Sequence, residues 1–407
     1  MRRVVVTGMG GVCGLGTSWP EILAGLRARR NTIRTMHEWD RFEDMNTRLA
    51  GPIEFTPPAH WTRKQLRSMG RVSQLAVRSA ELAIADAGLT GDPVISSGAT
   101  GVASGSSTGS TSDIKDFAAM IISGDASGLN ANSYVRMMPH TTAANVGIFF
   151  GAKGRIIPTS SACTSGSQGI GYAYEAIKFG RQDVMIAGGA EELCPTEAMA
   201  FDTLYATSRR NDQPQTTPRP YDRDRDGLVV GEGGAMLILE ELEHAQRRGA
   251  RIHAELVGFA SNSDGVHVTK PEENTMRVVM ELALRDAGIP PDVIGYVNGH
   301  GTATEHGDIA ETRATSALFG KRMPLSSQKS YLGHTLGACG ALEAWFSIEM
   351  MKTGWFAPSL NLENIDPRCG ELEYITGEGR AIGTEYVMNN NFAFGGVNTS
   401  MVFKRWK

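Results

Sequence analysis

The sequence is poor in cysteine and has no spacing that would pair cysteines with one another. Its 407 residues include five, Cys13, Cys163, Cys194, Cys339 and Cys369, with no CxxC motif among them. An odd number without such a motif argues against a disulfide framework and against a structural zinc site. We therefore expect free thiols, no bound metal ion and a reducing, cytoplasmic location.

Long apolar runs, strong net charge and low-complexity segments are also missing. No run approaches the roughly 18 apolar residues of a membrane-spanning helix, and the run that follows two arginines at the start, Val4–Val6, is too short for a signal peptide. The formal net charge of -4 provides no overall attraction to nucleic acid or to an anionic membrane. The 48 glycines and 41% hydrophobic residues are typical of a well-packed α/β protein.

Helix and strand patterns alternate along the chain, which favours an α/β fold. We expect buried strands near residues 4–6, 100–107, 183–190, 235–239, 252–258 and 294–298, and helices at 72–88, 240–251 and 274–288. Residues 105–133 are rich in Gly, Ser and Asn and are predicted to form loops. Because a chain of this length exceeds one core, we expect two halves, residues 1–251 and 252–407, and the repeated alternation indicates a duplicated α/β unit.

Three short motifs suggest other functions but are incomplete. The glycines at 8–14 lack the third glycine of a dinucleotide loop, because Cys13 takes its place. Residues 222–227 match the opening of a calcium loop, but the twelfth position is Gly233, and we expect a salt-bridged turn instead. Ser326 and Lys329 have the spacing of a serine acyl enzyme without its companion motifs.

Cys163 lies where an extended segment turns into a helix. Small residues surround it at 160–169, and apolar residues recur at helical spacing up to Gly180. Free N–H groups and the helix dipole at such a position favour an anion, which would lower the thiol pKa from its usual value of roughly 8.5. A cysteine that only packs in the core is the alternative, and this segment alone does not decide between the two.

Two histidines stand beside glycines in the second half. His300 lies between Gly299 and Gly301, directly after a predicted buried strand, which is more typical of a functional histidine than of a core histidine. His334 follows Gly333, and Lys329 lies five residues earlier. A thiol, two imidazoles and an ammonium group can divide a carbon–carbon bond-forming reaction among them.

The motifs around these residues resemble the β-ketoacyl-acyl carrier protein synthases of the elongating type, synthases I and II of bacterial fatty acid synthesis and their polyketide relatives. The resemblance covers essentially the whole chain and rests on Ser161-Ala162-Cys163, His300-Gly301-Thr302-Ala303-Thr304, Lys329-Ser330-Tyr331-Leu332-Gly333-His334 and Phe394-Gly395-Gly396-Val397-Asn398. It implies a thiolase-like fold, two pseudo-repeated α/β halves in five αβαβα layers, that works as a homodimer. It also implies substrates carried on the phosphopantetheine of acyl carrier protein, with no further cofactor.

The resemblance assigns roles to individual residues. Cys163 matches the nucleophile that takes the acyl chain from the carrier thioester. His300 and His334 match the pair that promotes malonyl decarboxylation and stabilises the enolate. Lys329 matches the lysine that holds the histidines, and Glu311 is its expected ion-pair partner. The implied reaction is a decarboxylative Claisen condensation that yields a β-ketoacyl carrier protein.

The resemblance also implies an oxyanion hole made by the backbone N–H groups of Cys163 and Phe394. The surrounding gate matches Phe392, Phe394, Gly395 and Gly396, and the hydroxyls that hold the pantetheine arm match Thr302 and Thr304.

A basic cluster precedes the first long helix. The spacing of four residues between Arg63, Arg67 and Arg71 predicts one shared helix face, with Lys64 beside it. By the resemblance, Arg63, Lys64 and Arg67 fall where the family presents positive charge to the acidic carrier protein.

Two alternatives to an elongating enzyme remain. A chain-length partner subunit of a heterodimer would shape a pocket without doing chemistry, but such partners typically lack the nucleophile that Cys163 supplies. A thiolase or a coenzyme A-primed synthase would carry a Cys-His-Cys or Cys-His-Asn set instead of two histidines and Lys329. Both fatty acid synthesis and a specialised polyketide or polyene pathway fit the motifs.

Overall fold

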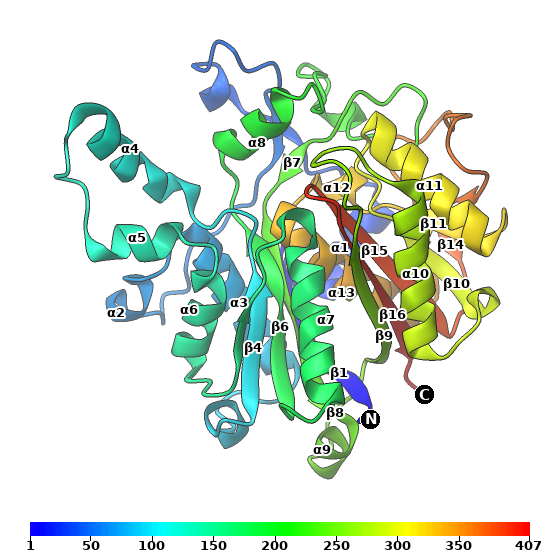
Figure 1. Ribbon diagram of the computed structural model, residues 1–407, viewed down its shortest axis with the longest axis horizontal. Helices are drawn as coiled ribbons and strands as arrows, with labels where there is room; N and C mark the ends of the chain where they lie inside the picture. Colours follow the sequence, from blue (N-terminus) through cyan, green and yellow to red (C-terminus); the bar gives the residue numbers. More distant parts are fainter.

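The computed structural model describes every residue from Met1 to Lys407, and most of its strands form one large mixed sheet (Figure 1). Its first-half strands are β1 (Val4–Val12), β4 (Thr100–Gly105), β5 (Ile156–Pro158), β6 (Val184–Glu191) and β8 (Gly233–Glu241). Its second-half strands are β9 (Ala254–Ser263), β10 (Ile294–Asn298), β11 (Pro324–Ser326), β13 (Glu373–Tyr374), β15 (Tyr386–Ala393) and β16 (Val397–Arg405). Short strands β2 (Arg34–Thr35), β3 (Leu49–Gly51) and β7 (Val230–Gly231) form a second sheet, and β12 (Trp355–Phe356) pairs with β14 (Arg380–Ala381).

The two halves of the large sheet repeat one topology. In the first half, β1 pairs antiparallel with β8, β8 antiparallel with β6, and β6, β4 and β5 are parallel. In the second half, β9 pairs antiparallel with β16, β16 antiparallel with β15, and β15, β10 and β11 are parallel. The two sets meet where β1 pairs with β9 over Val4–Val6. The chain passes from one set to the other through residues 248–253, where we predict the division between the halves.

Helices cover both outer faces and fill the space between the two halves of the sheet. They are α1 (Trp19–Arg27), α2 (Arg63–Leu66), α3 (Arg71–Asp86), α4 (Ile114–Ser123), α5 (Ala131–Met137), α6 (Thr141–Phe150), α7 (Ser165–Lys178), α8 (Pro195–Asp202), α9 (Leu242–Arg247), α10 (Glu273–Ala287), α11 (Glu305–Phe319), α12 (Lys329–Leu332) and α13 (Cys339–Thr353). Helices α3 and α6 pack on the first half, α10 and α11 lie on the second, and α7 and α13 contact strands of both (Figure 1). These five layers confirm the thiolase-like α/β fold.

Apolar burial fixes the central helices α7 and α13. The largest apolar cluster surrounds them and includes Ile170, Tyr174 and Ile177 of α7, the residues whose spacing predicted this helix. Glycines let helices approach the sheet closely. The glycines after Val6 continue strand β1, and a Cβ at Gly8 would lie 2.2 Å from the carbonyl oxygen of Ala83 in α3.

Two predictions about secondary structure were wrong. Residues 105–133 contain helix α4 and the start of α5, because the apolar run at 117–122 forms a helix despite its polar flanks. Residues 240 and 241 belong to β8, since the Glu240 carboxylate is buried against Arg248, and helix α9 begins only at Leu242.

No helix of the structure is long and apolar enough to cross a membrane.

The basic cluster does not lie on one helix face. Helix α2 ends at Leu66 and α3 begins at Arg71, and Gly70 before α3 has an extended backbone that lies so close to Ser110 that a Cβ there would be 2.0 Å from its hydroxyl oxygen. Arg71 therefore turns inward and pairs with the buried Glu232.

Candidate active site

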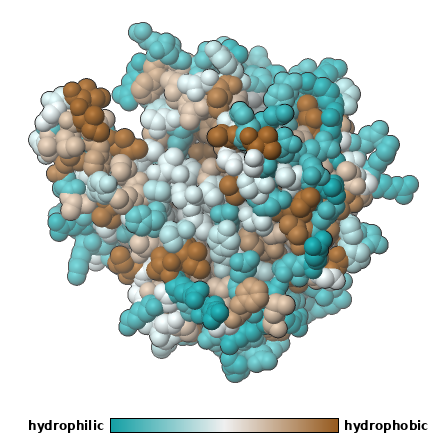
Figure 2. Space-filling view, in the orientation of Figure 1, coloured by the Kyte–Doolittle hydropathy of each residue, from teal (hydrophilic) through white to brown (hydrophobic).

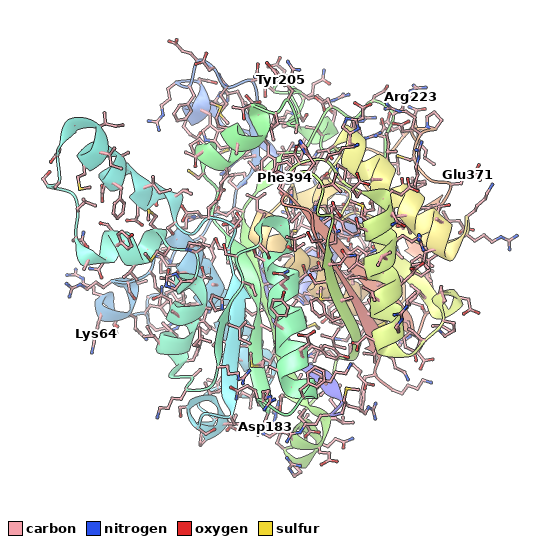
Figure 3. The ribbon with its side chains drawn as sticks, viewed as in Figure 1. Lys64, Asp183, Tyr205, Arg223, Glu371 and Phe394 are labelled. Atoms are coloured by element: carbon pink, nitrogen blue, oxygen red, sulfur yellow. The ribbon has the colours of Figure 1, made fainter.

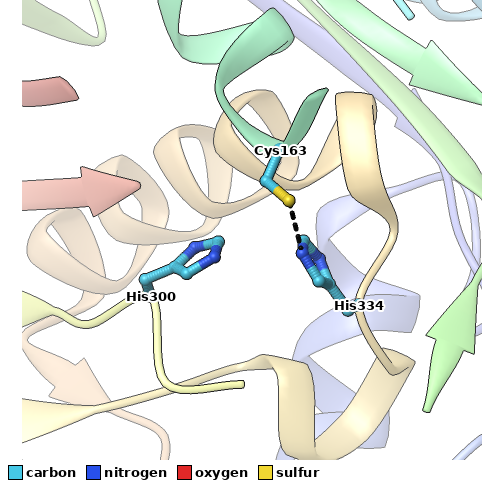
Figure 4. Close-up of side chains that lie close together, drawn as sticks. All are labelled: Cys163, His300 and His334. Carbon is cyan, nitrogen blue, oxygen red and sulfur yellow. Dashed lines mark hydrogen bonds between the residues drawn. The ribbon is translucent and has the colours of Figure 1, made fainter. Parts of the chain in front are cut away.

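The structure contains a cavity of about 450 Å3. Residues of both halves line it, with Cys163 contributed by the first half and His300 and His334 by the second. Its volume lies within the range of about 300–1,000 Å3 that is usual for ligand pockets. Figure 4 shows the thiol facing both imidazoles.

Cys163 occupies a short 3₁₀ helix, Ala162–Thr164, directly before α7. Ala162 adopts a φ of +51, a conformation that is strained for a residue with a Cβ and that is typical of functional turns. The turn places the thiol at the start of the helix, as the sequence predicts, but only 4% of Cys163 is exposed. Burial raises the pKa of this thiol to about 12, so the expected lowering of its pKa was wrong.

Several groups oppose the effect of burial on the thiol. The Lys329 ammonium and the backbone N–H groups of Phe394 and Cys163 itself all favour the anionic sulfur. These two N–H groups act on the Cys163 sulfur, and an oxyanion hole would need both of them to point at the carbonyl oxygen of a thioester attached there. Phe394 is fixed there by its contact with Phe201, with ring centroids 5.1 Å apart.

His334 contacts the thiol directly. Its Nε2 lies 3.0 Å from the Cys163 Sγ (Figure 4), while the backbone N–H of Leu336 donates to its Nδ1 at 3.3 Å. Because a backbone N–H can only donate, Nδ1 is the unprotonated nitrogen and Nε2 carries the hydrogen. His334 therefore presents an N–H group to the sulfur.

His300 faces His334 across the cavity floor, with ring centroids 5.1 Å apart and an interplanar angle of 87°. Its Nδ1 lies 3.4 Å from the amide nitrogen of Asn391, an arrangement that again leaves the hydrogen on Nε2. Burial and the nearby Lys329 hold the pKa of both imidazoles well below the usual value. Both rings are thus neutral donors at neutral pH.

Lys329 pairs with Glu343 of α13, and the expected ion pair with Glu311 was wrong. The Glu343 carboxylate also accepts from the amide of Asn391 at 2.7 Å, so the pair connects to His300 through this amide. Glu311 instead accepts the backbone N–H groups of His300 and of the glycine after it. Burial raises the pKa of Glu311 to about 8, against the effect of these two N–H groups.

The thiol and the two imidazoles also form the one group of His, Cys, Asp and Glu side chains whose geometry could hold a metal ion. Their ligand atoms lie within 4.8 Å of one another. The charge of the Lys329 ammonium acts on all three groups and opposes a second cation there. Hydrogen-bond donation from both rings suits an oxyanion better than a cation.

The wall of the cavity that holds Cys163, His300 and His334 contains the predicted pantetheine and gate residues. Thr302 and Thr304 line the cavity, with their hydroxyl oxygens 2.9 Å apart. Phe392, Phe394 and Gly396 also line it. Gly395 and Gly396 have φ values of +87 and +69, which residues other than glycine rarely adopt, so the turn after Phe394 depends on them.

The basic residues Arg63, Lys64 and Arg67 are exposed on and after α2. Figure 3 places Lys64 at the edge of the molecule, far from Phe394 at the cavity. Within one chain, these residues and the cavity mouth therefore lie apart.

Sequence reasoning missed Glu343 and Asn391. Both left a signal, since Glu343 is an acid within an otherwise apolar stretch of α13, and Asn391 ends a run of three asparagines inside a strand. It also missed the internal partners of the loop after His300, where Asp308 accepts the N–H of Thr302 at 3.1 Å and pairs with Arg225. The salt-bridged turn expected at 222–227 is present, with Arg225 reaching out to Asp308 and Asp366.

Comparisons with known proteins match the chain to one family. Two family models match, "Beta-ketoacyl synthase, N-terminal domain" over residues 1–245 and "Beta-ketoacyl synthase, C-terminal domain" over residues 253–363. The chain is 38% identical to 3-oxoacyl-[acyl-carrier-protein] synthase 1 of Haemophilus influenzae and 37% identical to the synthase 1 of Escherichia coli, in each case over 100% of both chains.

Among solved structures, a β-ketoacyl synthase from Burkholderia phymatum superimposes with a TM-score of 0.99 at 62% identity. The ishigamide ketosynthase/chain length factor gives a TM-score of 0.92 at 30% identity, and both likenesses cover the whole of each chain.

Proposed function

This chain belongs to the β-ketoacyl synthase family of condensing enzymes, and we propose that its cavity joins an acyl group to malonyl-(acyl carrier protein) with loss of CO2. The product is a β-ketoacyl-(acyl carrier protein) of fatty acid or polyketide synthesis. One observation carries the proposal: a buried thiol 3.0 Å from an imidazole nitrogen, with a second neutral imidazole facing the same space.

In the first half-reaction, the Cys163 sulfur attacks the carbonyl carbon of the acyl thioester. The N–H groups of Cys163 and Phe394 stabilise the oxyanion that forms. The carbon–sulfur bond to pantetheine then breaks, and the thiol proton leaves with the departing pantetheine sulfur. Because burial keeps the resting thiol protonated, we expect its deprotonation to accompany this attack.

In the second half-reaction, the thioester oxygen of the malonyl group sits between the Nε2–H groups of His300 and His334. The bond to the malonyl carboxylate breaks, CO2 leaves, and the electron pair forms an enolate whose oxygen accepts both hydrogen bonds. The enolate carbon attacks the acyl carbon on Cys163, and the sulfur departs and regains a proton. Neutral rings suit this role because they donate without forming a tight ion pair with the malonyl carboxylate.

Lys329 and Glu343 serve the reaction by orienting His300 through Asn391. Thr302 and Thr304, on the cavity wall, hold the pantetheine arm, and Phe392, Phe394, Gly395 and Gly396 form the gate around it. Glu311 holds the backbone at His300. No further cofactor is required, since the substrates arrive activated as thioesters.

The carrier protein docks on Arg63, Lys64 and Arg67, and the enzyme works as a homodimer in the cytoplasm. Exposed apolar side chains on α4 support the proposed dimer. Ile121 and Ile122 of this helix are 77% and 84% exposed (Figure 2). A second copy that covers α4 would remove this surface from water.

Mass measurement of the intact protein tests this function. Acyl-(acyl carrier protein) should add one acyl group to the wild type and none to Cys163→Ala, and added malonyl-(acyl carrier protein) should discharge it as a β-ketoacyl product. No acylation by any primer would contradict the proposal and favour a chain-length partner. Charge reversal of Arg63, Lys64 and Arg67 should raise the KM for the carrier steeply at low salt, and an unchanged KM would contradict the docking site.

A further inference from the structure

The turn that carries His334 is held mainly by residues of the other half of the chain. The backbone N–H of His334 donates to the carbonyl of Val229 at 2.7 Å, and its carbonyl accepts from the N–H of Gly231 at 2.8 Å. These two bonds fix the backbone on one side of the turn. They do not fix the orientation of the imidazole ring about its side-chain bonds.

A buried acid, Glu191 at the end of β6, holds the other side of the turn. Its carboxylate accepts from the backbone N–H of Gly337 at 2.9 Å, the N–H of Ser107 at 2.7 Å and the hydroxyl of Ser106 at 2.6 Å. A Cβ at Gly337 would lie 2.7 Å from this carboxylate, so the approach depends on glycine there. Nothing in the proposed mechanism uses Glu191, although its side chain is fully buried.

One residue connects Glu191 to the ring of His334. Leu336 precedes Gly337, adopts a φ of +44, and donates its N–H to the Nδ1 of His334 at 3.3 Å. Glu191 accepts the N–H of the peptide unit that follows Leu336. A shift of Gly337 would therefore rotate the Leu336 N–H away from the ring. Without that donor, Nδ1 could carry the hydrogen and Nε2 would lose it.

We propose that Glu191 is a positioning residue that keeps His334 in the Nε2–H form and aimed at Cys163. The inference rests on the proposed function, because it assigns Glu191 to the same site. Its charge also acts on the nucleophile, since it adds to the rise in the pKa of Cys163. The first half thus controls both its own thiol and an imidazole of the second half.

The adjacent residue Glu192 provides a matched control. It is also buried at the end of β6, and it accepts from the hydroxyls of Ser110 and Thr111 and from the N–H groups of Ser112 and Val72. None of these partners touches the His334 turn. Glu191→Gln and Glu192→Gln therefore remove the same charge from similar surroundings and differ in what they hold.

The test measures CO2 release from malonyl-(acyl carrier protein) and the ¹⁵N chemical shifts of labelled histidine in the whole enzyme. Glu191→Gln should lower kcat for decarboxylation by about 10- to 100-fold, the scale of a misplaced catalytic group, with little change in KM, and should shift the His334 signal away from the Nε2–H form. Glu192→Gln should stay within about threefold of the wild type with an unchanged signal.

Equal kcat values for the two variants, or an unchanged His334 signal in Glu191→Gln, would overturn the proposal. If Glu191→Gln does not fold, Ser106→Ala decides, because it removes one of the three donors and should lower kcat by about three- to tenfold with the same spectral change. An unchanged Ser106→Ala variant would then overturn it. Failure of the proposed function is distinguishable, because the wild type itself would release no CO2.

Discussion

The two histidines of the site are held in opposite ways. His300 depends on its own half of the chain, where Glu311 accepts its backbone N–H and Asn391 contacts its ring. His334 depends on the other half, through Val229 and Glu191. The difference teaches that the direct partners of the His300 backbone N–H and ring come from the second half alone, whereas those of His334 come from both halves.

The largest effect is expected when the buried ion pair that supports His300 is removed. Lys329→Ala leaves the Glu343 carboxylate buried without its ion-pair partner, which should cost about 3–5 kcal/mol of unfolding free energy. Denaturant unfolding measures it. The exposed pair of Lys321 and Glu371 provides the control, and Lys321→Ala should change the unfolding free energy by less than about 1 kcal/mol. Equal losses in the two variants would show that the buried pair is not a special support.

Removing either ring tests whether the two histidines are equivalent in the reaction. His300→Ala and His334→Ala should each lower kcat for decarboxylation by about 10²- to 10³-fold, because each removes one N–H donor to the enolate oxygen. Only His334→Ala should also lower the rate at which iodoacetamide alkylates Cys163, since only His334 contacts the sulfur. The exposed His37 offers a control, and equal alkylation rates in both variants would contradict the assignment.

The support of His334 depends on the docking of the two halves, and the contact between α7 and α10 contributes to that docking. Asp286 of α10 accepts from the hydroxyl of Tyr174 in α7 at 2.9 Å and pairs with Lys178. Asp286→Asn should cost about 1.5–3 kcal/mol in denaturant unfolding, the scale of hydrogen bonds to a charged group. Asp183→Asn, which breaks an exposed pair within the first half, should cost less than about 1 kcal/mol. The prediction fails if the second variant costs as much as the first.

The smallest effect concerns pH, and here the two rings should behave alike. The folded pKa of each histidine is depressed by burial, so the stability that this adds is present above the unfolded value of about 6.5 and is lost as pH falls below it. Each ring should contribute a loss of up to about 1.4 kcal/mol per pH unit there. Unfolding at pH 7.5, 6.5 and 5.5 measures this loss.

His300→Gln and His334→Gln should each reduce this loss by a similar amount. A ring whose replacement leaves the pH dependence unchanged is not held neutral in the folded protein. Glu311, whose pKa is raised to about 8, acts in the opposite direction, because its contribution is lost as pH rises. Comparing each variant with the wild type removes this shared background.

Motifs and periodicity predicted the large elements well where one physical signal dominated. The apolar spacing of Ile170, Tyr174 and Ile177 predicted α7, and the expected buried strands lie within a few residues of their true bounds except for β1, which continues from Val6 to Val12. The prediction failed where a distant contact decided the local structure. Helices α2 and α3 are separate where one helix face was expected, and Gly70 between them lies against Ser110, forty residues later, a contact that no local pattern contains.

By itself, the sequence determined which chemical groups are available to the active site: a thiol at a helix start, two imidazoles beside glycines and a lysine. Only the tertiary structure decided their state. It paired Lys329 with Glu343 instead of Glu311, and it raised the pKa of Cys163 where the helix position alone predicted a fall. The reason is physical, because hydrogen-bond partners and the loss of water around a group are set by segments that meet only when the whole chain has folded.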